Sequence, residues 1–399
     1  MAAPDTYSGV GAIYAGRFPP MPDWRPAAGT FDYISPASGP GHYLSDNFDL
    51  TNPQPLLRDA DGTYILDAWN STAQCADGTL AFGGGHHDRM NNAVHYYDRT
   101  LQMWSRIVDA TPLGIEVMDD NQCYGNIPAG AIANSWGEYW TDSGRTAVKE
   151  GKPGPPHTYG NFKWVPGSAF GNTKGAAVLM GGFSYGAHCV DLDNLAAGWQ
   201  RCGDLFTTVH PTTKVPGYGC TIWDSLRSRL FCYPSNGGGQ DDALILNFPS
   251  RTVEKAPGNF IDSYYQQGRH AVADDLYLVF GNDSPNYPKV KVLHPTSGAK
   301  YTPPQSGDIP PPLYTMEWDE TRRRLVGWGG TGTTLWFGQA PADMRTGTWV
   351  WTSQSFTAIN PAVPQAGTNG MYDRLHHDPV LDIYTIVTRV SGPVQCWGL

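Results

Sequence analysis

The feature that most constrains the fold of this chain is a short apolar run that recurs about every fifty residues. Six such runs, each ending in turn residues, begin at positions 79, 176, 229, 276, 324 and 383. A second strand-like segment and a turn containing Asp, Gly or Pro precede each run, which is the pattern of a β-hairpin. A period of about fifty residues is typical of a β-propeller, in which each repeat forms one blade of a ring.

The composition argues against a mainly helical protein. The 399 residues include 47 Gly and 33 Pro, which leave few windows long enough for helices. Many short strands joined by tight turns use both residues in quantity. The 14 Trp, 21 Tyr and 14 Phe supply the apolar surface that disordered chains lack. We therefore predict an all-β protein, a single closed β-propeller with six or seven four-stranded blades.

The number of blades depends on two gaps of about twice the period. One lies between the first two runs, and we interpret residues 110–156 within it as a long inserted loop. The other runs from the last strand through the C-terminus to the first blade. We expect residues 1–64 to form an N-terminal arm that supplies closing strands to the last blade, or a seventh blade, because pairing the chain ends removes an open sheet edge. The propeller itself is predicted over residues 65–399.

A fixed pattern follows the first two repeats, in which a Gly-Gly pair precedes an Asp, and a Trp stands six residues after that Asp. The residues are Gly83, Gly84, Tyr97, Asp98 and Trp104 in the first repeat and Gly181, Gly182, Asp193 and Trp199 in the second. On these residues the chain, over about 65–399, resembles the kelch-repeat propellers, the family shape that includes galactose oxidase. We expect Trp104 and Trp199 to pack between neighbouring blades. The resemblance implies little about activity, because this fold hosts many functions.

Charge and hydropathy exclude two classes of partner. The net charge of -10 leaves no basic surface for a phosphate backbone, so we expect no nucleic-acid partner. No run of apolar residues is long enough to span a membrane.

The N-terminal segment lacks the pattern of a signal peptide, so we expect a virion protein, a protein released by lysis, or a cytoplasmic one. An alternative is that Met1 and Ala2 are a cloning start joined to a mature sequence.

The cysteines and a His-His-Asp tripeptide bear on disulfides and metals. The chain has seven Cys, and the spacing of Cys189 with Cys202 and of Cys220 with Cys232 permits cross-strand disulfides, but buried free thiols are the favoured interpretation. The tripeptide 376–378 resembles a metal site, but neighbouring residues on a strand face opposite sides. We predict no metal and no other cofactor.

Candidate site residues come from the geometry of a propeller, in which the loop into each inner strand and the loop after each second strand share one face around the channel. The candidate catalytic residues, if the protein is an enzyme, are His157, Tyr159, Arg269 and His270. The candidate ligand-binding residues are His86, His87, Arg89, Tyr124, Trp136, Tyr139, Trp140, Tyr218, Tyr314 and Arg374. The structural alternatives are that the tyrosines fill the channel, that the polar loop residues bond loop carbonyls, and that Arg269 and His270 pair with Asp274 or Asp275.

Two functions fit these residues. The first is recognition of a polysaccharide or surface glycan, as on a phage tail fibre, with rigid aromatic side chains as contacts and protein partners bound through the N-terminal arm. The second is a polysaccharide lyase, because the Tyr, His and Arg set looks like that of the ulvan lyases. That resemblance implies an Arg that neutralises a uronate carboxylate, while His and Tyr transfer protons. Copper chemistry of the galactose oxidase kind is disfavoured, because no Cys is placed at the predicted mouth.

Overall fold

The computed structural model describes residues 28–34, 70–75, 78–82, 92–98, 103–108, 131–133, 139–141, 153, 158–180, 187–203, 219–233, 243–257, 267–280, 290–310, 315–358, 371–379, 381–388 and 394–399. Over these ranges the chain is almost entirely β. The helical elements are one short α-helix, α3 (Gly167–Phe170), and one 3-10 turn, η2 (Leu195–Ala197). No described helix is long and apolar enough to cross a membrane.

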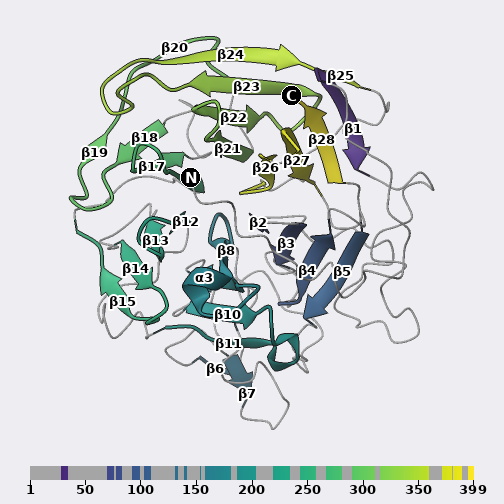
Figure 1. Ribbon diagram of the computed structural model, residues 1–399, viewed down its shortest axis with the longest axis vertical. Helices are drawn as coiled ribbons and strands as arrows, with labels where there is room; N and C mark the ends of the chain where they lie inside the picture. The colour runs from purple at the N-terminus through teal and green to yellow at the C-terminus, as the bar shows by residue number, and fades with distance from the viewer. Residues whose placement is uncertain are drawn as a thin grey trace.

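Six small sheets form a ring around a central channel, which makes the protein a six-bladed β-propeller (Figure 1). The prediction of an all-β propeller is confirmed, and of the two predicted blade numbers, six and seven, six is correct. The first three blades are β2 (Thr72–Gln74), β3 (Gly78–Phe82), β4 (Val94–Asp98) and β5 (Met103–Val108); β8 (Phe162–Val165), β9 (Ala176–Met180), β10 (Ala187–Asp191) and β11 (Trp199–Arg201); and β12 (Cys220–Asp224), β13 (Arg229–Tyr233), β14 (Leu244–Asn247) and β15 (Val253–Lys255).

The next two blades continue the ring in chain order. They consist of β16 (Gln267–Ala271), β17 (Leu276–Phe280), β18 (Val290–Leu293) and β19 (Lys300–Tyr301); and of β21 (Thr315–Asp319), β22 (Arg324–Trp328), β23 (Thr334–Gln339) and β24 (Trp349–Ser355). The fifth blade carries an extra outer strand, β20 (Gln305–Gly307), which pairs parallel with β24.

Both ends of the chain build the sixth blade. Its first three strands are β26 (Leu375–Asp378), β27 (Ile383–Val387) and β28 (Val394–Gly398), and β1 (Thr30–Ile34) pairs antiparallel with β28 (Figure 1). A further short strand, β25 (Thr357–Ala358), pairs parallel with β1. A strand from the N-terminal arm thus completes the ring, which covers the edge of β28 that would otherwise be open. The boundary between residues 64 and 65 stays a prediction.

The inserted segment 110–156 contains a short hairpin. Its strands β6 (Ala131–Ala133) and β7 (Tyr139–Thr141) pair antiparallel, with Ile132 opposite Trp140. Regular structure therefore exists inside a segment that the sequence predicted to be a loop. The side chains of this hairpin lie outside the described residues.

The core lies between the blades. Trp199 of the second blade is 1% exposed, and its ring packs edge-on against Phe82 of the first blade at 5.7 Å between centroids. Its indole N–H donates to the carbonyl of Asn92, which lies just before β4 of the first blade, at 2.6 Å. The prediction that Trp199 packs between blades is confirmed. The Trp104 side chain lies outside the described residues.

Each described cysteine is buried and is not part of a disulfide, which was the favoured interpretation of the sequence. Cys220 and Cys232 lie on opposite faces of their sheet, because the residue paired with Cys232 is Thr221. A disulfide between them is therefore excluded by the register. Cys189 and Cys202 share one core cluster, and contact with Cys189, together with burial, raises the pKa of the Cys202 thiol well above its usual value.

Candidate functional site

A cavity of about 400 Å³ lies at one end of the channel, where the inner strands of the blades end. The blades can be compared by the register of their first hairpins. In each inner strand, meaning the first strand of a blade, the reference point is the last residue that pairs with the second strand. The residues one position before that point all line the cavity: Ala73, Trp164, Trp223, His270, Trp318 and His377. Two positions before it, the lining residues are Thr72, Lys163, Arg269, Glu317 and His376. Each blade therefore contributes to the wall from the same place in its inner strand.

The mouth of this cavity is made by the turns that join first and second strands. Residues from these turns line it, namely Ser225, Val272, Glu320, Thr321 and Pro379. This is the opposite end of the channel from the mouth predicted from the sequence, which is formed by the loops into the inner strands and after the second strands. Most of those loops lie outside the described residues.

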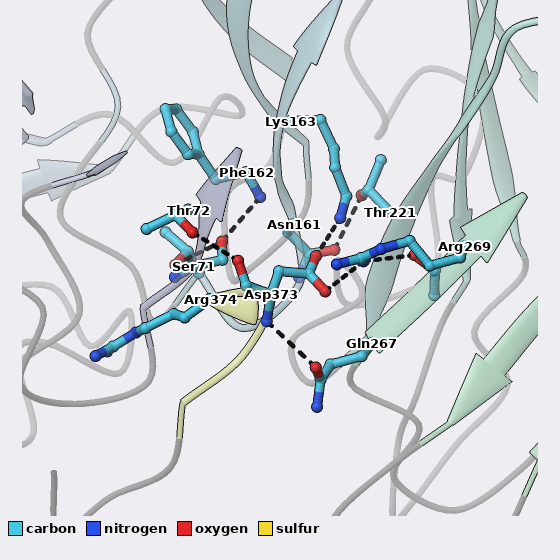
Figure 2. A network of polar contacts seen from close by, with 12 residues as sticks. Ser71, Thr72, Asn161, Phe162, Lys163, Thr221, Gln267, Arg269, Asp373 and Arg374 are labelled. Atoms are coloured by element: carbon cyan, nitrogen blue, oxygen red, sulfur yellow. Dashed lines mark hydrogen bonds and ion pairs between the residues drawn. The ribbon is translucent and has the colours of Figure 1, made fainter. Parts of the chain in front are cut away.

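Asp373, just before β26, is the centre of the polar network below the cavity (Figure 2). It is fully buried, and its backbone has a left-handed φ of 50°. One carboxylate oxygen is ion-paired with Lys163 of the second blade, and the other accepts from Arg269 Nη1 of the fourth blade at 2.6 Å. Asp373 thus ties three blades together across the channel.

The network continues from Arg269 around the channel. Arg269 Nε and Nη2 donate to the two carboxylate oxygens of Glu317 at 2.5 and 3.1 Å. Glu317 Oε2 lies 3.3 Å from His376 Nδ1. His376 Nε2 lies 2.7 Å from the hydroxyl of Thr72, which also donates to the Asp373 carbonyl at 2.7 Å. The floor of the cavity is therefore a continuous network that joins five of the six blades.

The charges of this network balance. Burial opposes the ionised form of Glu317, but Arg269 and His376 outweigh it and lower the pKa of Glu317 to about 2. Burial lowers the pKa of His376, which favours the neutral imidazole at neutral pH. Burial also lowers the pKa of Lys163, although Asp373 opposes this shift. Two cations thus face two carboxylates, with no unmatched charge among them.

Neighbouring residues on β16 have different environments. Arg269 faces the network, whereas the His270 side chain is only 2% exposed, with Nε2 3.3 Å from Asp275 Oδ1. The His270 ring also packs edge-on against Tyr277 at 5.4 Å. The alternative that His270 pairs with Asp275 is therefore confirmed, while Arg269 pairs with carboxylates from other blades.

A repeated ion-pair cluster supports the wall of the cavity. Asp224 at the end of β12 accepts from Tyr277 of the next blade at 2.6 Å, and Arg227 bridges it to Asp275. The fifth and sixth blades repeat this arrangement with Asp319, Arg322, Asp382 and Tyr384. Sequence reasoning missed these clusters, although the sequence carries their signal in two Trp-Asp-x-x-Arg-x-Arg segments, 223–229 and 318–324.

His376 and His377 lie on opposite sides of β26, as the strand geometry predicted. His376 contacts Thr72 and Glu317, whereas His377 Nδ1 lies 3.6 Å from Asp319. In the part of the chain that the structure describes, no group of three or more His, Cys, Asp or Glu side chains is placed to hold a metal ion.

The other candidate residues are mostly elsewhere. Tyr159 is 2% exposed and packs edge-on against Tyr372 at 5.1 Å. Arg374 is fully buried and donates to the carbonyls of Asn70 and Thr388, so its visible role is to join the first and last blades. The structure does not bring these two side chains to the cavity. The candidates whose side chains lie outside the described residues are His86, His87, Arg89, Tyr124, Trp136, Tyr139, Trp140, His157, Tyr218 and Tyr314.

No family model and no curated protein sequence matches the chain. Among the solved structures that are similar to it are the following three. The major allergen Mala s 1 of Malassezia sympodialis is 8% identical, with a TM-score of 0.43 over 84% of this chain and 92% of that one. An auxiliary nutrient binding protein of Bacteroides thetaiotaomicron is 6% identical, with a TM-score of 0.44 over 84% and 69%. A chain of the mitotic checkpoint complex is 10% identical, with a TM-score of 0.41 over 84% and 89%. Similarities of this size carry no information on activity.

Proposed function

We propose that this protein binds a neutral carbohydrate in the cavity formed by the ends of its inner strands. The observation that carries the proposal is the make-up of the wall, in which tryptophans stand above a polar floor with balanced charges. The volume of about 400 Å³ falls within the range of small-molecule sites, roughly 300–1,000 Å³.

The wall and floor offer the two kinds of contact that a sugar needs. Trp164 and Trp223 are half-buried, so part of each side chain stays accessible beside the cavity. Aromatic side chains supply rigid apolar contact at a low cost in conformational entropy, which suits the C–H face of a sugar ring. Below them, Lys163 has N–H donors beyond the one paired with Asp373 and Glu317 is an acceptor, and a hydroxyl can bond to either kind.

The balanced floor favours a neutral ligand over a uronate. A ligand carboxylate would approach Glu317 and Asp373 without an unmatched cation to receive it, because Arg269 is already bonded to both. The lyase hypothesis needs an Arg that is free to neutralise the substrate, together with a nearby proton-transfer group. His270 has its imidazole buried against Asp275. These contacts support binding rather than β-elimination.

The kelch-type assignment and the biological setting belong to the same proposal. The kelch pattern rests on the Gly-Gly, Asp and Trp spacing of the first two repeats, with Trp104 and Trp199 at its end. A place on a phage particle, or outside the cell after lysis, follows from the expectation of a surface glycan as ligand. Protein partners would then bind through the N-terminal arm.

The test is a titration of the protein with neutral and uronate-containing glycans. We expect binding to at least one neutral glycan, and Trp223→Ala should weaken it by about tenfold or more, equivalent to about 1.4 kcal/mol. The matched control is Trp336→Ala, since Trp336 is also half-buried but lies on β23 and does not line the cavity. Equal losses in both variants, or no binding to any neutral glycan, would contradict the proposal. Formation of an unsaturated ultraviolet-absorbing product from a uronate polymer would instead support the lyase.

A further inference from the structure

Buried polar side chains fill the channel beneath the cavity. At the level where the inner strands begin, each blade contributes one polar residue that is at most 1% exposed. In blade order these residues are Ser71, Asn161, Thr221, Gln267, Thr315 and Asp373. This layer lies between the cavity and the opposite mouth of the propeller.

Hydrogen bonds hold the layer together between neighbouring blades. The Ser71 hydroxyl accepts from the Phe162 N–H at 3.3 Å, and the Thr221 hydroxyl donates to Asn161 Oδ1 at 3.0 Å (Figure 2). On the other side of the ring, the Thr315 hydroxyl accepts from the Arg374 N–H at 3.1 Å. These bonds link the first blade to the second, the second to the third, and the fifth to the sixth.

Other contacts join blades that are not neighbours in the ring. Gln267 Oε1 of the fourth blade accepts from the Asp373 N–H of the sixth blade at 3.3 Å. The Asp373 carboxylate is paired with Lys163 of the second blade and with Arg269 of the fourth blade (Figure 2). Opening a passage here would separate buried charges from their partners, which is strongly unfavourable. The cavity is therefore closed at its inner end.

A closed inner end limits how a polymer can enter. In an internal segment of a glycan the chain continues on both sides, so both flanking chains would have to leave the cavity through its single mouth. A terminal residue has one connection and can enter with the rest of the chain outside. We propose that the cavity receives the terminal residue of a neutral glycan end-on, with the chain leading out past the turns at the mouth. This inference rests on the proposed function and specifies the part of the ligand that is bound.

The floor has the chemistry to recognise such an end. A terminal residue carries a free hydroxyl where an internal residue has a glycosidic oxygen, which can accept a hydrogen bond but not donate one. Lys163 has N–H donors beyond the one paired with Asp373 and can donate to a hydroxyl, while Glu317 can accept a hydrogen bond from it. A site built to bond a hydroxyl discriminates strongly against a group that lacks it.

The experiment counts binding sites per mass of glycan. Linear neutral polysaccharides (amylose, pullulan and linear mannan) are each used intact and after partial acid hydrolysis, which multiplies the chain ends without changing the composition. The reducing-end content gives the number of ends, and calorimetric titration with the wild-type protein gives the number of sites. We expect the sites per gram to rise in proportion to the ends, so that a tenfold increase in ends gives a tenfold increase in sites.

The outcomes separate this inference from the proposed function. Binding with the same number of sites per gram before and after hydrolysis would overturn end-on recognition and leave carbohydrate binding intact. Absence of binding to every intact and hydrolysed glycan would overturn both. The comparison uses only wild-type protein, so it does not depend on whether a cavity variant folds.

Discussion

Replacing Asp373 with Asn tests the network that closes the channel. The substitution keeps the shape of the side chain and removes its charge. Arg269 would keep its two bonds to Glu317, but Lys163, whose side chain is only 11% exposed, would lose the carboxylate it is paired with. Removing one member of a buried ion pair costs about 3–5 kcal/mol. We therefore expect Asp373→Asn to lower the free energy of unfolding by about that amount.

The assay is urea unfolding at pH 7, followed by circular dichroism and tryptophan fluorescence. Lys163→Met should also destabilise the protein, and the double variant should lose less than the sum of the single losses, by about 0.5–3 kcal/mol, because the two groups are in direct contact. Asp343→Asn is the control, since that carboxylate is 43% exposed beside Arg345, and it should leave the midpoint nearly unchanged. A loss below about 1 kcal/mol for Asp373→Asn would refute the reasoning, and so would strict additivity of the pair.

The pH dependence of the Asp373→Asn variant follows from Lys163. Burial already lowers the pKa of Lys163 from its usual 10.5, and Asp373 is what opposes that shift. In the variant, the pKa of Lys163 in the folded protein falls further. At a pH between this lowered pKa and the usual lysine pKa of 10.5, the unfolded chain therefore binds more protons than the folded chain. Stability then rises with pH towards the usual lysine pKa. We expect the difference in free energy of unfolding between wild type and Asp373→Asn to be smaller at pH 9.5 than at pH 7. A difference that does not change with pH would contradict this account.

Three further predictions concern the blades and the acid side of the network. Trp199→Ala should cost about 3–5 kcal/mol in urea unfolding, because the ring is buried against Phe82; a loss under about 1 kcal/mol would argue against packing between blades. Tyr277→Phe and Tyr384→Phe should each cost about 1–3 kcal/mol, because each removes a hydroxyl that donates to a buried carboxylate, and the two losses should add, since the clusters share no residue. A double variant far from the sum would show that the two clusters are coupled. The pKa of Glu317 is lowered from 4.5 to about 2, so its contribution is present above pH 4.5 and lost as the pH falls towards 2. Wild type should therefore lose more stability over that range than Glu317→Gln, and parallel curves would contradict the assignment.

The architecture could be predicted because its signals are local. Each blade begins with a hairpin whose strands are close in sequence, so the spacing of apolar runs and turns revealed the propeller, and the Asp193 to Trp199 spacing placed Trp199 between blades. The number of blades could not be read in the same way. Two gaps of similar length have different contents, since one holds an insertion with the hairpin of β6 and β7, and the other is completed by β1 pairing with β28. That pairing joins residues from opposite ends of the chain, which no local pattern specifies.

The candidate site was decided by the tertiary structure. Sequence reasoning selected His, Tyr and Arg from loops. The cavity is instead lined by residues within the inner strands, which occupy equivalent positions in the six blades. Arg269 was selected, but its partners Asp373 and Glu317 lie 104 and 48 residues away, and Lys163 lies 210 residues from Asp373. The alternation of a strand shows that Arg269 and His270 face different ways. Which carboxylates each of them meets depends on how the blades are rotated against one another when the ring closes, and that geometry exists only in the folded chain.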